Sequence, residues 1–346
     1  MSDQVVNALF ATALGLVLAV LLLLPTAVVQ YRRDGRLGAG DLATLVGAAV
    51  YALALWTYTL MPFPVDNSFP CRRSRLDVME SLRPVIERGL LPLSQLLHQT
   101  AFQQLALNVL LFVPLGFFVR LVVHRGPAVT AALGLVVSLA IEVTQATGVW
   151  GLYHCAYRTF DVDDLLTNTL GAVLGGVLAW ALLHPERRTP EALPTSITLG
   201  RRWVGFACDL IFLVVVGATV ALGWRAFEHY ARAVPMRAID DQITVGLQLA
   251  VPLAVEAALV LLAGRTVGEW AISVRAVGGR LPTPLARLVK LVTGVGGFAC
   301  LAVPGSWGSG LLLVGFVLLT LAASVRSRGH RGLAQWLAGM ELEISR

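Results

Sequence analysis

The sequence predicts an all-α, polytopic helical membrane protein with about nine transmembrane helices. The mean hydropathy of its 346 residues is +0.73, and 14% of them are charged, whereas soluble domains contain about 25%. Apolar runs recur at or near the roughly 18 residues that indicate a membrane-spanning helix. The sequence lacks the alternation over about ten residues that is typical of outer-membrane strands.

The spans follow one another along the chain, and each must be helical because lipid offers no partner for backbone polar groups. They cover residues 7–30, 41–61, 103–123, 127–147, 162–183, 202–224, 243–263, 290–304 and 309–325. The last two are short and could form one bent hairpin around 304–310. The first run is predicted to be an anchor, since no basic residue precedes Arg32 and no A-x-A cleavage site follows it.

A polar stretch with three prolines, residues 184–200, marks the clearest domain boundary. We therefore predict a five-helix membrane domain over 1–183, a cytoplasmic linker over 184–200, and a second membrane domain of three to four helices over 201–346. Segment 76–100 is predicted to be amphipathic and to lie along the outer membrane surface. Segment 264–290 is either an interfacial helix or a solvated inner loop.

The basic residues indicate the orientation of the chain. With the N-terminus outside and the C-terminus in the cytoplasm, the inner segments contain 18 of the 27 Lys and Arg residues. This bias follows the positive-inside rule, which also explains the net charge of +6 without a nucleic-acid partner. The predicted localisation is the cell membrane, and the predicted partners are membrane lipids.

Polar residues gather at the predicted outer ends of three helices. The third helix contains Asn108, Phe112, Pro114 and Gly116; the fourth contains Ser138, Glu142 and Gln145; and the fifth is entered through Arg158, Asp161, Asp163, Asp164 and Asn168. A carboxylate inside a bilayer costs roughly 2.5–3.5 kcal/mol even on the mildest scale, so it normally faces a partner or a cavity. The pattern therefore favours a polar pocket open to the outer leaflet.

Each polar residue has a predicted role in that pocket. Glu142, Asp161 and Asp164 are candidates for general acid or base catalysis. Arg158 is the nearest candidate partner for Glu142, and its guanidinium suits phosphate oxygens. The remaining candidates for substrate binding are Asn108, Gln145, Asp163 and Asn168. The alternative is purely structural: Asp161 stands where a helix N-cap belongs, and Asn168 could bond across helices.

Structural roles are predicted for several other residues. Gly171 and Gly175 form a GxxxG pair that lets another helix approach closely. Cys71 and Cys155 fall in two different outer loops, where a disulfide bond between them is permitted; two free thiols are the alternative. The six histidines are scattered without zinc-ligand spacing, so no metal and no cofactor are predicted.

These motifs, in this order over about residues 40–183, resemble the VanZ-like family. Its pattern is matched by Asn108, Phe112, Pro114 and Gly116, then Glu142 and Gln145, then Arg158, Asp161, Asp164, Asn168 and Gly171. The family is named for a protein linked to glycopeptide (teicoplanin) resistance. The resemblance implies a protein of the cell envelope, with a role in antibiotic resistance and a lipid-linked cell-wall precursor or glycopeptide as its expected partner.

The C-terminal half resembles a second family, the RDD family, over about residues 200–340. Arg202 and Asp209 match its arginine and the aspartate seven residues later, and both are predicted to be structural. Glu269 stands where that family usually has a lysine, and Gln335 stands where it usually has an aspartate. From the residues alone, Asp209 is expected to pair with a neighbouring arginine.

Three functions remain open from the sequence. The first is an envelope protein that recognises or acts on an outer-leaflet lipid or cell-wall component. The second is a membrane enzyme for phosphoryl or glycosyl transfer or hydrolysis on a lipid-linked substrate. The third is a transporter, which should show acids near the midplane and broken helices or inverted repeats.

Overall fold

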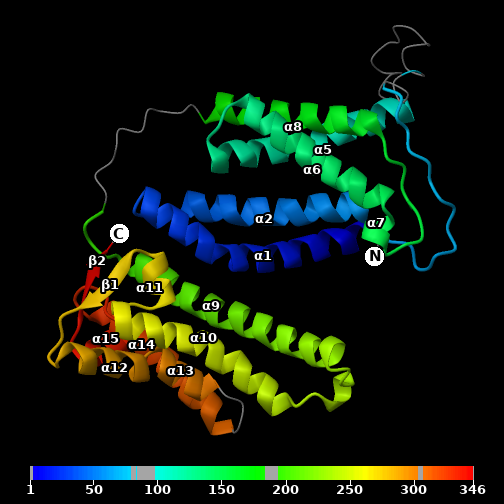
Figure 1. Ribbon diagram of the computed structural model, residues 1–346. Helices are drawn as coiled ribbons and strands as arrows, with labels where there is room; N and C mark the ends of the chain where they lie inside the picture. The colour runs from blue at the N-terminus through cyan, green and yellow to red at the C-terminus, as the bar shows by residue number, and fades with distance from the viewer. Residues whose placement is uncertain (1–2, 79–82, 84–97, 184–193, 303–306, 346) are drawn as a thin grey trace. The chain divides into compact units, whose positions relative to one another are not determined.

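The computed structural model describes residues 3–78, 83, 98–183, 194–302 and 307–345, and most of these are helical (Figure 1). Within these residues, eight helices are long and apolar enough to span a membrane, and a ninth apolar helix, Gly310–Arg326, is shorter. The chain is thus an all-α polytopic membrane protein, as predicted. The predicted amphipathic segment 76–100 lies largely outside the described residues, as does most of the 184–200 linker.

The chain divides into two compact units, which are described separately. Unit 1 comprises Met1–Ala19 and Leu42–Pro190, and unit 2 comprises Val20–Asp41 and Glu191–Arg346. The first helix is therefore shared between the units, whereas the sequence placed it wholly in the N-terminal domain.

Unit 1 is built from the first helices of the chain. They are α1 (Asp3–Arg33, in part), α2 (Ala39–Leu60), α5 (Thr100–Val123), α6 (Pro127–Ala146), the short α7 (Gly148–Gly151) and α8 (Val162–Leu182). Small residues set the contact between α5 and α8, which lie side by side in Figure 1. A Cβ at Gly116, Gly171 or Gly175 would overlap a backbone carbonyl oxygen of the facing helix. The glycines thus allow direct backbone contact, as the GxxxG pair predicts.

Unit 2 contains the remaining helices and a small sheet. They are α9 (Leu199–Ala226) with a π-helical turn (Phe227–Ala231), a 3-10 turn (Met236–Ala238), α10 (Asp241–Ala263), α11 (Val267–Ala271), α12 (Thr283–Thr293), α13 (Val295–Ala302), α14 (Trp307–Arg326) and α15 (Leu333–Ala338). The eighth candidate span, Thr283–Ala302, is interrupted at Gly294 between α12 and α13. It begins seven residues before the predicted 290–304, because Pro284 at the start of α12 favours helix initiation.

Segment 264–290 forms neither a single interfacial helix nor a plain loop. It contains α11, strand β1 (Val274–Val277) and most of α12. β1 pairs antiparallel with β2 (Glu341–Ile344), with Val274 opposite Ile344. The small core beside this sheet includes Tyr31 of α1, which is 3% exposed.

Candidate functional site

The carboxylates of unit 1 meet where α8 begins. Asp161 has extended backbone angles and is the N-cap of α8; its side chain accepts a hydrogen bond from the Asp163 N–H at 2.9 Å. Glu142, near the end of α6, accepts the Asp161 N–H through Oε2 at 3.0 Å. Both carboxylates are only 3% exposed. Glu142 therefore fixes the backbone at the entry of α8, and Asp161 fills the structural role that its position indicated.

Asp164 lies one turn further along α8 and joins it to α5. The Asn108 side-chain amide donates to Asp164 Oδ1 at 2.6 Å. Both residues are partly exposed, in contrast to Glu142 and Asp161. This pair is thus the part of the predicted polar group that a ligand could reach.

Two further predicted residues hold helices together. Asn168 on α8 donates to Ser138 Oγ on α6 at 2.9 Å, and both are buried. Gln145 donates to the carbonyl oxygen of Thr59 on α2 at 2.7 Å. These contacts match the structural alternative for Asn168, because each amide donates to an acceptor on another helix.

The arginine beside the acids is Arg75 rather than Arg158. The Arg158 guanidinium donates to the Met61 carbonyl oxygen at 2.8 Å, so its observed contact is with backbone and not with Glu142. The Arg75 guanidinium lies 3.7 Å from the Asp161 carboxylate and is half-exposed. Backbone bonds fix this register, because the Arg75 N–H donates to Phe160 O and Val162 N–H donates to Arg75 O.

The segment after α2 is fastened to the loop before α8. Tyr153 and Tyr157 donate their hydroxyls to the carbonyl oxygens of Pro64 and Leu60, at 3.0 and 2.8 Å. Phe69 packs against both tyrosine rings and against His154, with centroids 5.1–6.5 Å apart. The cluster holds the segment that presents Arg75.

A disulfide bond joins Cys71 to Cys155, with Cα atoms 5.6 Å apart, as the sequence predicted. We expect both thiols to be unreactive towards a maleimide until the protein is reduced, and both to react afterwards. A Cys71→Ser variant is the control, because it should leave Cys155 reactive without any reductant. Full labelling of both cysteines in the untreated protein would contradict the bridge.

The described residues offer one group with metal-ligand atoms in proximity. The side chains of Cys71, His154 and Cys155 have such atoms within 4.8 Å of one another. The two cysteines are bonded to each other, so neither provides the thiolate that metal binding requires.

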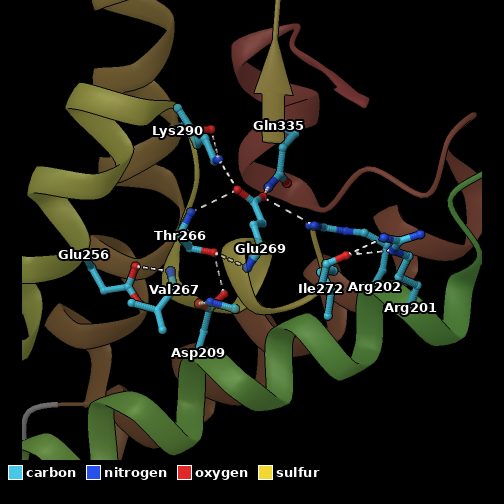
Figure 2. Close-up of polar contacts among 12 residues, drawn as sticks. Arg201, Arg202, Asp209, Glu256, Thr266, Val267, Glu269, Ile272, Lys290 and Gln335 are labelled. Carbon is cyan, nitrogen blue, oxygen red and sulfur yellow. Dashed lines mark hydrogen bonds and ion pairs between the residues drawn. The ribbon is translucent and has the colours of Figure 1, made fainter. Parts of the chain in front are cut away.

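Unit 2 contains a second polar group, centred on Glu269 (Figure 2). The Glu269 carboxylate accepts hydrogen bonds from Lys290 Nζ at 2.5 Å and from Gln335 Nε2 at 2.6 Å, and Arg202 Nη1 lies 3.4 Å away. All four side chains are at most 4% exposed. Burial raises the pKa of Glu269, but the charges of Lys290 and Arg202 outweigh that effect and hold the pKa below its usual range.

Asp209 on α9 belongs to the same group but is bonded to neutral donors. Its carboxylate accepts from Thr266 Oγ1 at 2.9 Å and from the Gly268 N–H. Thr266 and Glu269 form a reciprocal capping box at the start of α11. The residues that the second resemblance singled out therefore converge, whereas Arg202, the arginine expected beside Asp209, contacts Glu269 instead.

Three residues of these polar groups were not predicted as site residues from the sequence: Lys290, Glu256 and Arg75. Lys290 is the only lysine in the chain, and this was a usable signal. Glu256 lies inside an apolar helix, where an acidic side chain normally faces a partner because burying it alone is costly. Its Oε2 accepts the Val267 N–H at 3.1 Å. Arg75 had no local signal, because its partner lies far away in the sequence.

Comparison with known proteins bears on the first unit only. No curated protein and no solved structure matches the chain. The RDD resemblance over residues 200–340 stays a prediction. Residues 48–184, which contain α5 to α8 and the whole carboxylate group of unit 1, match the family model described as VanZ/LLP1.

Proposed function

We propose that this membrane protein recognises or acts on an outer-leaflet lipid or a cell-wall component, through the accessible residues Arg75, Asn108 and Asp164 of unit 1. The supporting observation is the combination of an arginine and carboxylates at one end of the helices. Buried Glu142 and Asp161 hold that end in place, while Asn108 and Asp164 remain partly exposed. A link to glycopeptide resistance is part of this proposal.

The three side chains suit a headgroup with phosphate or sugar. A guanidinium offers planar paired donors that match phosphate oxygens, and Arg75 is half-exposed. The Asp164 carboxylate accepts hydrogen bonds, so it suits sugar hydroxyls. The Asn108 amide already orients Asp164 through the 2.6 Å bond, so the acceptor is pre-positioned.

The orientation of the chain is also a proposal. The excess of Lys and Arg in segments between alternate helices favours an outside N-terminus and a cytoplasmic C-terminus. The Cys71–Cys155 bridge supports the same side for the headgroup site, because disulfides persist in oxidising compartments. A membrane-impermeant reductant added to intact cells should therefore release both thiols.

Lipid co-purification tests the proposed recognition. The wild-type chain in nanodiscs should retain a phosphate- or sugar-bearing lipid detectable by mass spectrometry, and Arg75→Ala and Asp164→Asn should each reduce its occupancy about tenfold. That factor corresponds to one charge-assisted hydrogen bond of about 1.5–3 kcal/mol. Arg73→Ala is the matched control, an arginine of the same exposed segment. Equal occupancy in all four proteins would refute the site.

A catalytic role is the second candidate, favoured by the direct bond between Glu142 and the Asp161 backbone. This bond brings two carboxyl groups from different helices together beside Asp164. If the chemistry is phosphoryl or glycosyl transfer, Glu142→Gln should retain bound lipid and abolish its turnover. A variant that loses both points to a structural role for Glu142.

A further inference from the structure

Unit 2 contains a half-open cavity of about 270 Å³ that the proposed function does not use. Its walls come from the membrane-spanning helices, with apolar side chains such as Leu213, Phe298 and Phe316. One end is polar, because Asp209, Glu269 and Lys290 also line the cavity. The cavity therefore has the two-sided character of an amphiphile: an apolar length and one charged end.

The charged groups at the polar end are paired unequally. Lys290 and Arg202 both contact the Glu269 carboxylate, at 2.5 and 3.4 Å. Asp209 is held by a hydroxyl and a backbone N–H, which are neutral donors. The cations thus contact Glu269, whereas Asp209 lines the cavity, accepts from neutral donors and is partly exposed. A cationic group placed there would complement the carboxylate.

The interruption at Gly294 adds to this preference. Thr293, Gly294 and Val295 all line the cavity, so α12 ends in its wall. The carbonyl end of a helix has partial negative charge and favours a cation. Broken helices in membrane proteins are found where irregular backbone borders a cavity.

We propose that this cavity binds a single-chain amphiphile with a protonated amine head, seated on Asp209 with its alkyl chain along α9, α13 and α14. The volume sets the size of this ligand. It is just below the about 300–1,000 Å³ of ordinary small-molecule pockets, which suits a single alkyl chain. This ligand is distinct from the headgroup proposed for unit 1.

Three twelve-carbon probes that differ only at the head test the proposal: dodecylamine, dodecanol and dodecanoate. The full chain in phosphatidylcholine nanodiscs is titrated with each, and empty nanodiscs give the background from partitioning. We expect saturable 1:1 binding of the amine, at least tenfold tighter than the alcohol, with the carboxylate weakest. Equal affinity for amine and alcohol would overturn the proposal.

Two variants separate head from chain. Asp209→Asn removes the charge and keeps one of the two side-chain oxygens that accept from Thr266 and Gly268, so the amine should lose its advantage over the alcohol. Leu213→Trp fills the apolar part and should weaken both probes. Asp241→Asn, an exposed aspartate of α10, is the control and should bind as wild type. If Asp209→Asn fails to fold, the comparison of the three probes on the wild type and the affinity of Leu213→Trp still test the proposed site. An unchanged preference in Asp209→Asn, or unchanged affinity in Leu213→Trp, would refute the site.

Discussion

Glu269→Gln is expected to lower the free energy of unfolding by about 3–5 kcal/mol, because it leaves two buried cations without their counter-charge. Lys290 and Arg202 are 2% and 1% exposed and both contact the Glu269 carboxylate. Glutamine preserves the shape of the side chain, so the loss reports charge and not packing. Denaturant titration of the purified chain in mixed micelles gives the free energy of unfolding.

Two further variants identify the cause of that loss. Adding Lys290→Met to Glu269→Gln should recover part of the stability, because it removes one uncompensated buried cation. Glu343→Gln is the control: Glu343 pairs with Arg275, but their side chains are 42% and 49% exposed, so the expected loss is below about 1 kcal/mol. If the double variant is less stable than Glu269→Gln alone, unpaired charge is not the reason for the loss.

The helices could be predicted from the sequence because hydropathy is a local property. Apolar runs of about 20 residues must be helical in lipid, wherever they lie in the fold. The start of α8 could also be predicted from a local signal, since Asp161 precedes the helix and caps it. β1 and β2 were missed because each has four residues, and Val274 pairs with Ile344, 70 residues later. Nothing in either segment alone indicates that pairing.

The candidate site shows the same division between local and distant information. Helical spacing correctly placed Asp161 and Asp164 on one side of α8, near Glu142 of α6. Arg158 was chosen as the partner because it is close in sequence, yet it turns to the carbonyl of Met61. Arg75 reaches Asp161 because two loops pair with each other, and the two residues are 86 positions apart in the sequence. Hydropathy carries no information about such a pairing. Only the predicted disulfide between Cys71 and Cys155 indicated that these two loops are in contact.

Gly175→Ala is expected to separate α8 from α5, because a Cβ at this position would overlap the carbonyl oxygen of Val113 and lie 3.0 Å from the Phe117 nitrogen. Backbone atoms cannot rotate away as a side chain can, so one of the helices must move. Overpacking of this kind costs about 1–3 kcal/mol. Gly246→Ala on α10 is the control: no atom lies within 4 Å of its added Cβ, and alanine has the better helix propensity, so this variant should be neutral or slightly stabilised.

The same substitution tests whether the α5–α8 contact maintains the proposed headgroup site. Asn108 on α5 bonds to Asp164 on α8 at 2.6 Å, and Gly171 and Gly175 follow on the face that meets α5. The shift of the helices that relieves this overlap should therefore weaken this bond together with the packing. Gly175→Ala should then lose bound lipid as Asp164→Asn does, although it alters no group near the ligand. If Gly175→Ala is destabilised but retains full lipid occupancy, the spacing of α5 and α8 does not set the geometry of the site, and Arg75 with its disulfide-anchored segment must position the ligand without it.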